Sequence, residues 1–467
     1  MVNTNQAIYL LDRLGFGPRP GDLNQLQSQG WEEYLRQQLQ GNLAEPNDLK
    51  LRLNALENMQ LNPVELYRRY HVNPRKMSAE EVRQRRQGLR KARREAIHAR
   101  LLYAVESPNQ LREVMVDFWF NHFNVANSKG MTGFWVGAYE RDVIRPHALG
   151  QFRALLGATA KHPAMLFYLD NWRNRAPDGS MSNGRPTGLN ENYARELLEL
   201  HTLGSDGPYI QDDVEALARI FTGWTLSRDN PGTPPGSGFR FAPGRHDRGS
   251  KVFLKTAIDP AGQQEGELAL DMLASHPATA RHISFKLAQY FVSDTPSQTL
   301  IDSLAAVFQS QNGNIKAVLK ALFTHQEFWH AGERSPKFKT PYQYILSAVR
   351  AMGVKAPMSD ALQRLNGMLN QLGMPVQGCR TPDGYPQTQA DWLDADEMMR
   401  RVSFAVGIAN FRNWDSVRLV SADAATPKGL FETLGPRFSR HTKAVVDQAP
   451  PYLKPGLILG SPEMMYR

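Results

Sequence analysis

Apolar residues recur three or four positions apart along most of this chain, and that spacing restricts it to a mainly helical fold. In an α-helix this spacing places the apolar side chains on one face, where they can pack against a core. Strand-like alternation of apolar and polar residues is rare. We therefore expect a large multi-helical globular fold of the mainly α class with little β, its helices covering residues 7–14, 79–106, 111–120, 134–145, 152–160, 190–203, 211–221, 266–273, 278–291, 299–309, 315–324 and 395–410.

Two long stretches rich in glycine and proline interrupt the helical series, over residues 174–188 and 227–251. Loops of this length inside a compact protein usually carry function or lack order. A third irregular stretch, over residues 373–392, precedes the last predicted helix. The sequence therefore predicts a helical body with long Gly/Pro-rich loops.

The length and composition are those of an ordinary globular protein, with 467 residues of which 41% are hydrophobic. We expect one domain over residues 1–467, including a basic helical segment at 60–105 and a C-terminal helical part at 335–467. No run reaches the roughly 18 apolar residues that a membrane helix needs, so we expect no membrane span. No secretory signal pattern is visible, which favours a cytoplasmic location. The single cysteine, Cys379, excludes an intramolecular disulfide framework and a zinc site of several thiolates.

The formal net charge of +9 is concentrated between Arg83 and Arg100, where Glu95 is the single acidic residue. Such a run on a helix is ordinarily a solvated face. The alternative is a binding surface for a polyanion such as nucleic acid or an anionic glycan. No aromatic residue interleaves the run up to Arg100, which disfavours base stacking. On the polyanion interpretation, the candidate contacts are Arg86, Arg90, Arg93 and Arg94.

Several short phrases occur in a fixed order along the chain. They include LLDRLGFGP at residues 10–18, FWFNHFNV at 118–125, YERDVIRPHALG at 139–150 and NENYARELLEL at 190–200, followed by TGW at 222–224, HD at 246–247 and KTP at 339–341. This ordered set resembles the family called domain of unknown function 1800, over nearly the whole chain. The family name records no assigned activity, so the resemblance implies no catalytic residues. Members of the family often look secreted, and the missing signal puts that location in doubt here.

Glu140 and His147 are the first candidate catalytic residues. They stand seven positions apart in a predicted helix, within about 20° of each other on an apolar face and about 10 Å apart along its axis. They could therefore flank one ligand, and burial there would raise the pKa of the carboxyl and lower that of the imidazole unless each found a partner. The alternative is that Pro146 ends the regular helix and His147 caps its C-terminus.

Glu196 and Glu199 form a second candidate pair on the predicted helix over residues 190–203. With Asn192 they share one side of that helix, whereas His201 points into the apolar side and is expected to be a core histidine. Two carboxylates one turn apart could hold one divalent cation or pair with arginines. A metal site would combine them with His122 from a neighbouring helix, although the Glu-x-x-His pairs of di-iron bundles are absent.

Other polar residues lie where predicted helices end or inside the long loops. Such positions can bind a polar substrate, and they can equally satisfy exposed helix-end groups. The candidate substrate-binding residues are Asn121, Asp170, Asn171, Asn192 and His246.

Three functions remain open. The sequence lacks the phosphate-binding loop, the dinucleotide fingerprint and the common zinc-protease and serine-hydrolase motifs. The chain could be an enzyme, with or without one divalent metal ion, that hydrolyses or modifies a polar or polymeric substrate. It could instead be a polyanion-binding protein or a non-catalytic scaffold. We favour the enzyme because polar residues are concentrated at 121–147 and 170–201.

Overall fold

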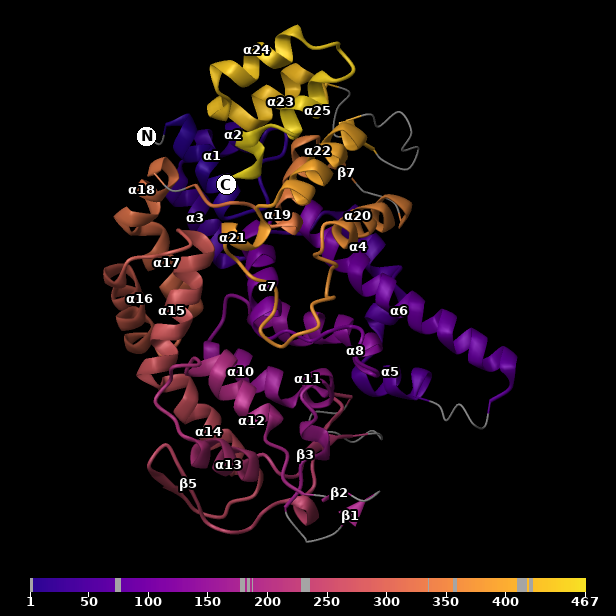
Figure 1. Cartoon of the computed structure of the whole chain (residues 1–467), viewed down its shortest axis with the longest axis vertical. Helices are drawn as coiled ribbons and strands as arrows, with labels where there is room; N and C mark the ends of the chain where they lie inside the picture. The colour runs from indigo at the N-terminus through magenta and orange to yellow at the C-terminus, as the bar shows by residue number, and fades with distance from the viewer. Residues whose placement is uncertain are drawn as a thin grey trace.

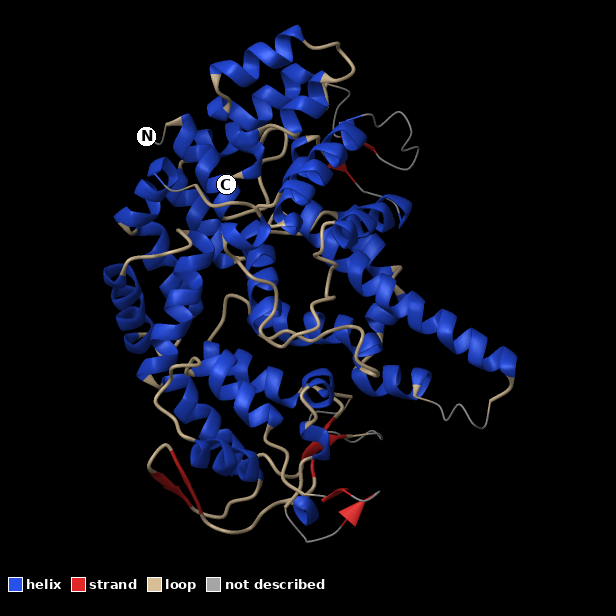
Figure 2. Ribbon diagram, viewed as in Figure 1, coloured by secondary structure: helices blue, strands red, loops and turns tan. Residues whose placement is uncertain are grey.

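The computed structural model describes residues 3–71, 77–176, 181–182, 185–186, 188–227, 236–334, 336–355, 359–409, 418–419 and 423–467. Most of these residues are helical and the strands are two or three residues long, so the predicted mainly α class is confirmed (Figure 2). Among the described residues, none of the helices combines the length and apolar character needed to cross a membrane. The expected loops at 174–188 and 227–251 lie partly outside the described residues.

The first third of the chain packs short helices around two long ones. The long helix α6 begins at a capping box, in which the Ser78 hydroxyl accepts from the Glu81 amide and the Glu81 carboxylate accepts from the Ser78 amide. Its N-terminal half extends away from the body, while α7 runs through the interior (Figure 1). The helices here are α1 (Thr4–Arg13), α2 (Asp22–Gln29), α3 (Trp31–Gln40), α4 (Asn47–Asn54), η1 (Glu57–Gln60), α5 (Pro63–Tyr70), α6 (Ala79–Glu106) and α7 (Gln110–His122).

The next segment contains two π-helices, η3 and η5. In η3 the Arg145 amide donates to the Glu140 carbonyl five residues back, and in η5 the Leu203 amide donates to the Leu198 carbonyl. Short π-helices of this kind occur frequently at functional sites. The helices of this segment are α8 (Thr132–Tyr139), η3 (Glu140–Ile144), α9 (Arg145–His147), α10 (Phe152–Lys161), α11 (Pro163–Tyr168), η4 (Asn171–Arg173), α12 (Asn192–Glu196), η5 (Leu197–Thr202) and α13 (Gln211–Ile220).

The remaining helices form the rest of the body, with α23 to α25 at the opposite end of the molecule from α13 and α14 (Figure 1). The residues at 373–388, between α20 and α21, have no regular structure and cross the centre of the molecule. We call them the covering loop. The helices are η6 (Pro243–Arg245), α14 (Gln263–Ser275), α15 (Pro277–Phe291), α16 (Gln298–Ser310), α17 (Ile315–Thr324), α18 (Gln326–Arg334), α19 (Pro341–Ala351), α20 (Ser359–Gln371), α21 (Gln389–Trp392), α22 (Ala395–Ala409), α23 (Pro427–Leu434), η8 (Gly435–Arg437), α24 (Arg440–Gln448), α25 (Lys454–Leu459) and η9 (Pro462–Met465).

The strands form two-stranded antiparallel ribbons only, within the part of the chain that the structure describes. In the ribbon that closes the second long loop, Thr225 lies opposite Arg240. These ribbons connect helices and contribute no central sheet. The pairs are β1 (Met181–Ser182) with β2 (Arg185–Pro186), β3 (Trp224–Leu226) with β4 (Phe239–Phe241), β5 (Lys251–Phe253) with β6 (Thr256–Ile258), and β7 (Val354–Lys355) with β8 (Arg418–Leu419).

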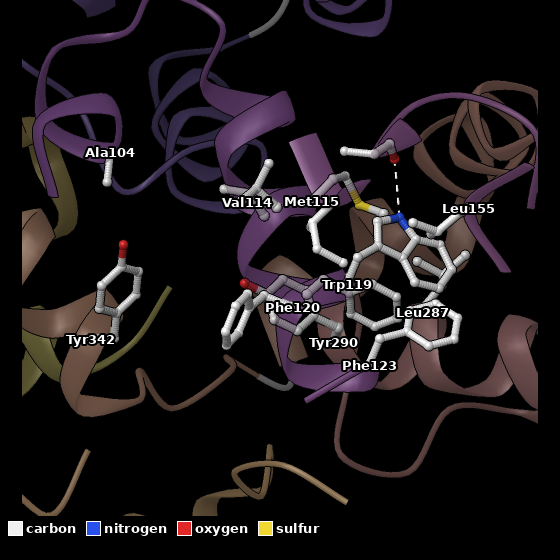
Figure 3. Packing of buried hydrophobic residues seen from close by; sticks show 14 of the residues in the cluster. Ala104, Val114, Met115, Trp119, Phe120, Phe123, Leu155, Leu287, Tyr290 and Tyr342 are labelled. Carbon is white, nitrogen blue, oxygen red and sulfur yellow. Dashed lines mark hydrogen bonds between the residues drawn. The ribbon is translucent and has the colours of Figure 1, made fainter. Parts of the chain in front are cut away.

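The core centres on α7, which is buried on all sides and so lacks the polar face of a surface helix. Trp119 is fully buried, and its Nε1 donates to the Ala148 carbonyl at 3.0 Å. Figure 3 shows its indole among Met115, Phe123 and Leu287, side chains that come from α7, from the turn after it and from α15. Because α7 ends inside this packing, the polar residues at its C-terminus are held in the middle of the protein.

Candidate functional site

Glu140, the first predicted catalytic residue, lies at the start of η3 and is 4% exposed. Its Oε1 accepts from Arg145 Nη2 at 3.0 Å, and its Oε2 accepts from Arg100 Nη1 at 3.2 Å. Gln377 Nε2 donates to the same Oε2 at 2.9 Å. Both carboxylate oxygens are thus occupied, and the buried acid has found the partners that a buried charge requires.

Glu140 belongs to a wider network of buried ion pairs. Arg100 Nη2 donates to Asp117 at 2.8 Å, and Arg145 donates to Glu113. Burial by itself would lower the pKa of Arg100, but the Glu140 and Asp117 carboxylates raise it above its ordinary value. Burial also opposes the charge of Arg145, whose pKa is raised by Glu113 and Glu140. Both arginines therefore stay charged, and the network joins α6, α7 and η3.

His147 forms its side-chain contact within its own helical segment. Its Nδ1 lies 2.7 Å from the Val143 carbonyl, one turn earlier in the chain. The helix-end interpretation thus describes His147, and the Glu140 carboxylate points to Arg100 and Arg145 instead. Each side chain thus has a partner within the protein, and the prediction that Glu140 and His147 flank one ligand stays a prediction.

Asn121, predicted to bind substrate, holds the covering loop. Its Nδ2 donates to the Tyr385 carbonyl at 2.8 Å, and its Oδ1 accepts from the Tyr385 amide at 2.7 Å. Gly384 has φ +79°, and a Cβ there would lie 2.3 Å from the Asn121 carbonyl oxygen. Glycine is therefore required where the loop passes closest to α7.

Two further groups fix the covering loop. Asn124 Nδ2 donates to the carbonyls of Cys379 at 3.0 Å and Thr381 at 2.7 Å. The Tyr168 hydroxyl donates to the Arg380 carbonyl at 2.7 Å. These bonds satisfy backbone carbonyls that no helix or sheet satisfies. They bring the loop against the end of α11.

A cavity of about 20 Å³ lies beneath the covering loop, between it and the buried ion pairs. It has room for about one water molecule. Its polar lining is Arg100, Asp117, Asn121, Asn124, Gln377 and Tyr385. The cavity is too small to hold a substrate as the loop now lies.

Three imidazoles meet beside the C-terminus of α7. The ring of His122 lies 6.0 Å from that of His201 and 6.1 Å from that of His282, centre to centre. Burial lowers the pKa of His201 to about 3 and of His282 to about 4, and it moves the pKa of His122 well below its ordinary value. All three rings are therefore neutral at pH 7. His201 is a buried core histidine, as expected.

Lys286 of α15 lies next to these imidazoles. Its charge helps to lower the pKa values of His122 and His282. Burial lowers the pKa of Lys286 itself, and the carboxylate of Asp383 in the covering loop opposes that shift. Lys286 donates no hydrogen bond and forms no ion pair with any residue that the structure describes.

Glu196, the last residue of α12, is half-buried beside the same loop. Burial raises its pKa, and the carboxylates of Glu199 and Asp383 raise it further, against a smaller opposing effect of Arg195. It has no hydrogen bond or ion pair within the described ranges. Glu196 and Asp383 also contribute to the raised pKa of Tyr168, whose first cause is burial. We call Tyr168, Glu196, Lys286 and Asp383 the acid–base group.

The predicted metal ligands His122, Glu196 and Glu199 are not brought together. Among the described residues, no three His, Cys, Asp or Glu side chains are grouped as a metal ion requires. His122 is buried, and its Nε2 lies 3.1 Å from the His201 carbonyl. Glu199 is 33% exposed and lies 3.9 Å from Arg195. This set therefore forms no cluster within the described ranges, because His122 points into the core while Glu199 lies near Arg195.

The other predicted substrate-binding residues form contacts within the protein. Asn171 is buried, and its Nδ2 donates to the Trp224 carbonyl at 3.1 Å. The Asp170 carboxylate lies 2.8 Å from Lys129 Nζ. Asn192 Nδ2 donates to the Leu169 carbonyl at 3.2 Å, and His246 Nε2 lies 2.9 Å from the Glu265 carboxylate. These contacts satisfy polar groups at element ends.

Sequence comparison assigns the chain to a family. The family model described as Protein of unknown function (DUF1800) matches residues 9–466. The chain belongs to the DUF1800 family. Neither the curated proteins nor the solved structures give a match. The resemblance seen in the sequence is thus confirmed, and function has to be argued from the side chains.

The basic residues of this DUF1800 protein divide into two groups along α6. Arg86, Arg90 and Arg94 are exposed and stand one turn apart on one face. Arg93 is half-buried against Gly133, where a Cβ would lie 2.4 Å from its Nε. Arg100 is buried in the ion-pair network, so the predicted basic surface ends before it. We call Arg86, Arg90 and Arg94 the arginine stripe.

Sequence reasoning missed Lys286 and Asp383. Neither stands in a recognisable motif, and they are separated along the chain from Glu196. The irregular composition of residues 373–392 was the one available signal, since long irregular segments often carry functional residues.

Proposed function

We propose that this DUF1800 protein is an enzyme that hydrolyses or otherwise modifies a polar or polymeric substrate by acid–base catalysis at Glu196. The charge of Asp383 in the covering loop acts on both Glu196 of α12 and Lys286 of α15, and this shared neighbour carries the proposal. The pKa of Glu196 is raised and that of Lys286 is lowered, so both pKa values shift toward neutral pH from opposite sides. Environments that shift titratable groups in this way mark acid and base roles in enzymes.

In a hydrolysis, three residues of the acid–base group would have separate roles. The protonated Glu196 carboxyl would donate its proton to the leaving group as the bond to that group breaks. The exposed Asp383 carboxylate would take a proton from the attacking water, whose oxygen forms the new bond. Lys286, which forms no hydrogen bond or ion pair with the described residues, would contact an oxygen of the substrate.

A substrate panel tests the proposal. Chromogenic esters, phosphate esters, glycosides and peptide amides would be incubated with wild type, with Glu196→Gln and with Glu215→Gln. Glu215 is exposed on the adjacent helix α13 and serves as the matched control. We expect wild type and control to turn over the same class, and Glu196→Gln to lose about 100-fold or more in kcat. Equal turnover by wild type and Glu196→Gln would contradict the role of Glu196.

A second measurement requires no substrate. Acylation of lysines by acetic anhydride, followed by peptide mass spectrometry between pH 6 and pH 11, reports the pKa of each amine. Lys286 should react with a midpoint below that of Lys316, which is exposed on α17. Equal midpoints for Lys286 and Lys316 would contradict a lowered pKa for Lys286.

The arginine stripe supports a second candidate function, binding of a polyanion. Arg86, Arg90 and Arg94 have no acidic partner among the residues that the structure describes. They lie on α6, whose N-terminal half extends away from the body (Figure 1). Unpaired cations at one-turn spacing suit contacts with successive phosphates or sulfates. The acid–base group remains the favoured function because it combines several perturbed groups from separate elements.

A further inference from the structure

A pocket of about 610 Å³ lies between α1, α18 and the last residues of the chain. This volume is typical of sites for small organic molecules. Its wall includes the aromatic side chains Tyr9, Trp329 and Tyr466 and the cations Arg437 and Arg467. None of these residues belongs to the acid–base group or to the arginine stripe.

Two buried cations have unused hydrogen-bond donors, Arg467 in this wall and Arg13 behind it. Arg13 is fully buried, and its Nη1 donates to the Phe291 carbonyl at 3.0 Å. Its Nε and Nη2 have no acceptor in the described part of the protein. Arg467 is 6% exposed, and its Nη2 donates to the Tyr290 carbonyl at 2.6 Å, while its Nε likewise has no described acceptor. A buried donor without an acceptor costs folding free energy, especially on a charged group. A ligand that supplied acceptors here would remove that cost.

Cations also outnumber acids among the charged neighbours of the nearby residue Lys339. Lys339 is buried, and its Nζ donates to the Ser347 hydroxyl at 3.1 Å. Burial lowers the pKa of Lys339 to about 7, and among its charged neighbours Asp12 opposes the shift while cations reinforce it. Those cations are Arg437, Arg467 and Arg401.

The acids in the pocket wall are partly occupied. Asp12 Oδ2 lies 2.8 Å from Arg437 Nη2, although Asp12 Oδ1 has no hydrogen-bond partner among the described residues. Glu463 Oε1 accepts from the Ser439 amide at 2.9 Å and from the Thr442 hydroxyl at 2.9 Å. Ordered water could supply acceptors to the unpaired nitrogens, but water carries no charge and would leave the positive balance unchanged.

We infer that this pocket binds a small organic phosphate whose body is aromatic or apolar. Arg437 and Arg467 would contact the phosphate, since guanidinium groups match phosphate geometry. Tyr9, Trp329 and Tyr466 would pack against the body. A dianionic phosphate offsets several neighbouring cations better than a carboxylate does, which favours phosphate as the charged group.

Titration of the full chain with simple probes tests the inference. The probes are phenyl phosphate, inorganic phosphate, benzoate and phenol, measured by isothermal titration calorimetry and by the change in Tm. We expect saturable binding of phenyl phosphate with one site per chain, at least tenfold weaker binding of inorganic phosphate and benzoate, and none of phenol. Absence of saturable phenyl phosphate binding to wild type overturns the inference, whatever the variants do.

Two variants and a control locate the site. Arg437→Gln should weaken phenyl phosphate binding at least tenfold, because it removes a cation from the wall. Trp329→Leu should remove the preference for phenyl phosphate over inorganic phosphate while keeping phosphate binding, since it changes only the aromatic wall. Lys316→Gln removes one positive charge from the exposed face of α17 and should bind as wild type does. If Lys316→Gln weakens binding as much as Arg437→Gln, the binding is a general charge effect and the pocket is not the site.

Discussion

The Asn121 carboxamide forms two hydrogen bonds with the backbone of Tyr385, one of 2.8 Å to its carbonyl and one of 2.7 Å from its amide. An asparagine at the end of a buried helix thereby fixes a loop far away in the sequence. Asp383 lies two residues before Tyr385, so this contact also holds that carboxylate near Glu196 and Lys286. The acid–base group depends on a contact that takes no part in its chemistry.

Asn121→Ala should release the covering loop. The variant leaves the Tyr385 amide and carbonyl without their partner, at a cost of about 1–3 kcal/mol in the free energy of unfolding. Limited proteolysis should cut between residues 376 and 388 faster than in wild type. Asn192→Ala, which removes a single bond from an exposed asparagine, is the control. Unchanged cleavage in Asn121→Ala would show that other contacts hold the loop.

Glu140→Ala should destabilise the protein strongly. It removes the shared partner of Arg100 and Arg145 and leaves two buried cations short of a carboxylate, which costs about 3–5 kcal/mol. Urea unfolding followed by circular dichroism measures the change. Glu215→Ala, at an exposed position, should stay within about 0.5 kcal/mol of wild type. A Glu140→Ala variant as stable as this control would mean that the ion pairs do not hold α6, α7 and η3 together.

Stability should rise with pH through the titration of Lys339. Burial lowers the pKa of this lysine to about 7 in the folded state, against an ordinary value of 10.5. Between these values the unfolded chain binds more protons at this site, so raising the pH favours the folded state by up to about 1.4 kcal/mol per pH unit. In Lys339→Met the free energy of unfolding should lack this rise between pH 7 and pH 10. Parallel pH profiles for wild type and variant would refute the assignment.

The arginine stripe should control any binding to nucleic acid or heparin. Replacing Arg86, Arg90 and Arg94 by glutamine should lower affinity and reduce the slope of log K against log salt by about 1 for each arginine. Fluorescence anisotropy with labelled duplex DNA at several salt concentrations measures both effects. A triple variant at the exposed residues Lys316, Lys320 and Lys443 controls for net charge. Equal losses in the two triple variants would exclude a localised site on α6.

Much of the fold could be predicted because helix formation depends on local spacing and local caps. The predicted helix over 79–106 is α6, and the predicted helix over 315–324 is α17. The Ser78 and Glu81 capping box explains why α6 begins where it does. The two π-helices were not predicted. Their amides donate to the carbonyl five residues earlier, and this arrangement depends on the packing of surrounding elements and leaves no periodic pattern in the sequence.

The sequence by itself determined the helical class, the family and the concentration of polar residues near Glu140 and Glu196. Only the tertiary structure decided their roles. Glu140 became an ion-paired residue because Arg100 reaches it from α6 beside its sequence neighbour Arg145, whereas Glu196 has no described hydrogen-bond or ion-pair partner and keeps a raised pKa. The physical reason is that helix periodicity is a local property, while burial and charge neighbours come from residues far apart in the chain.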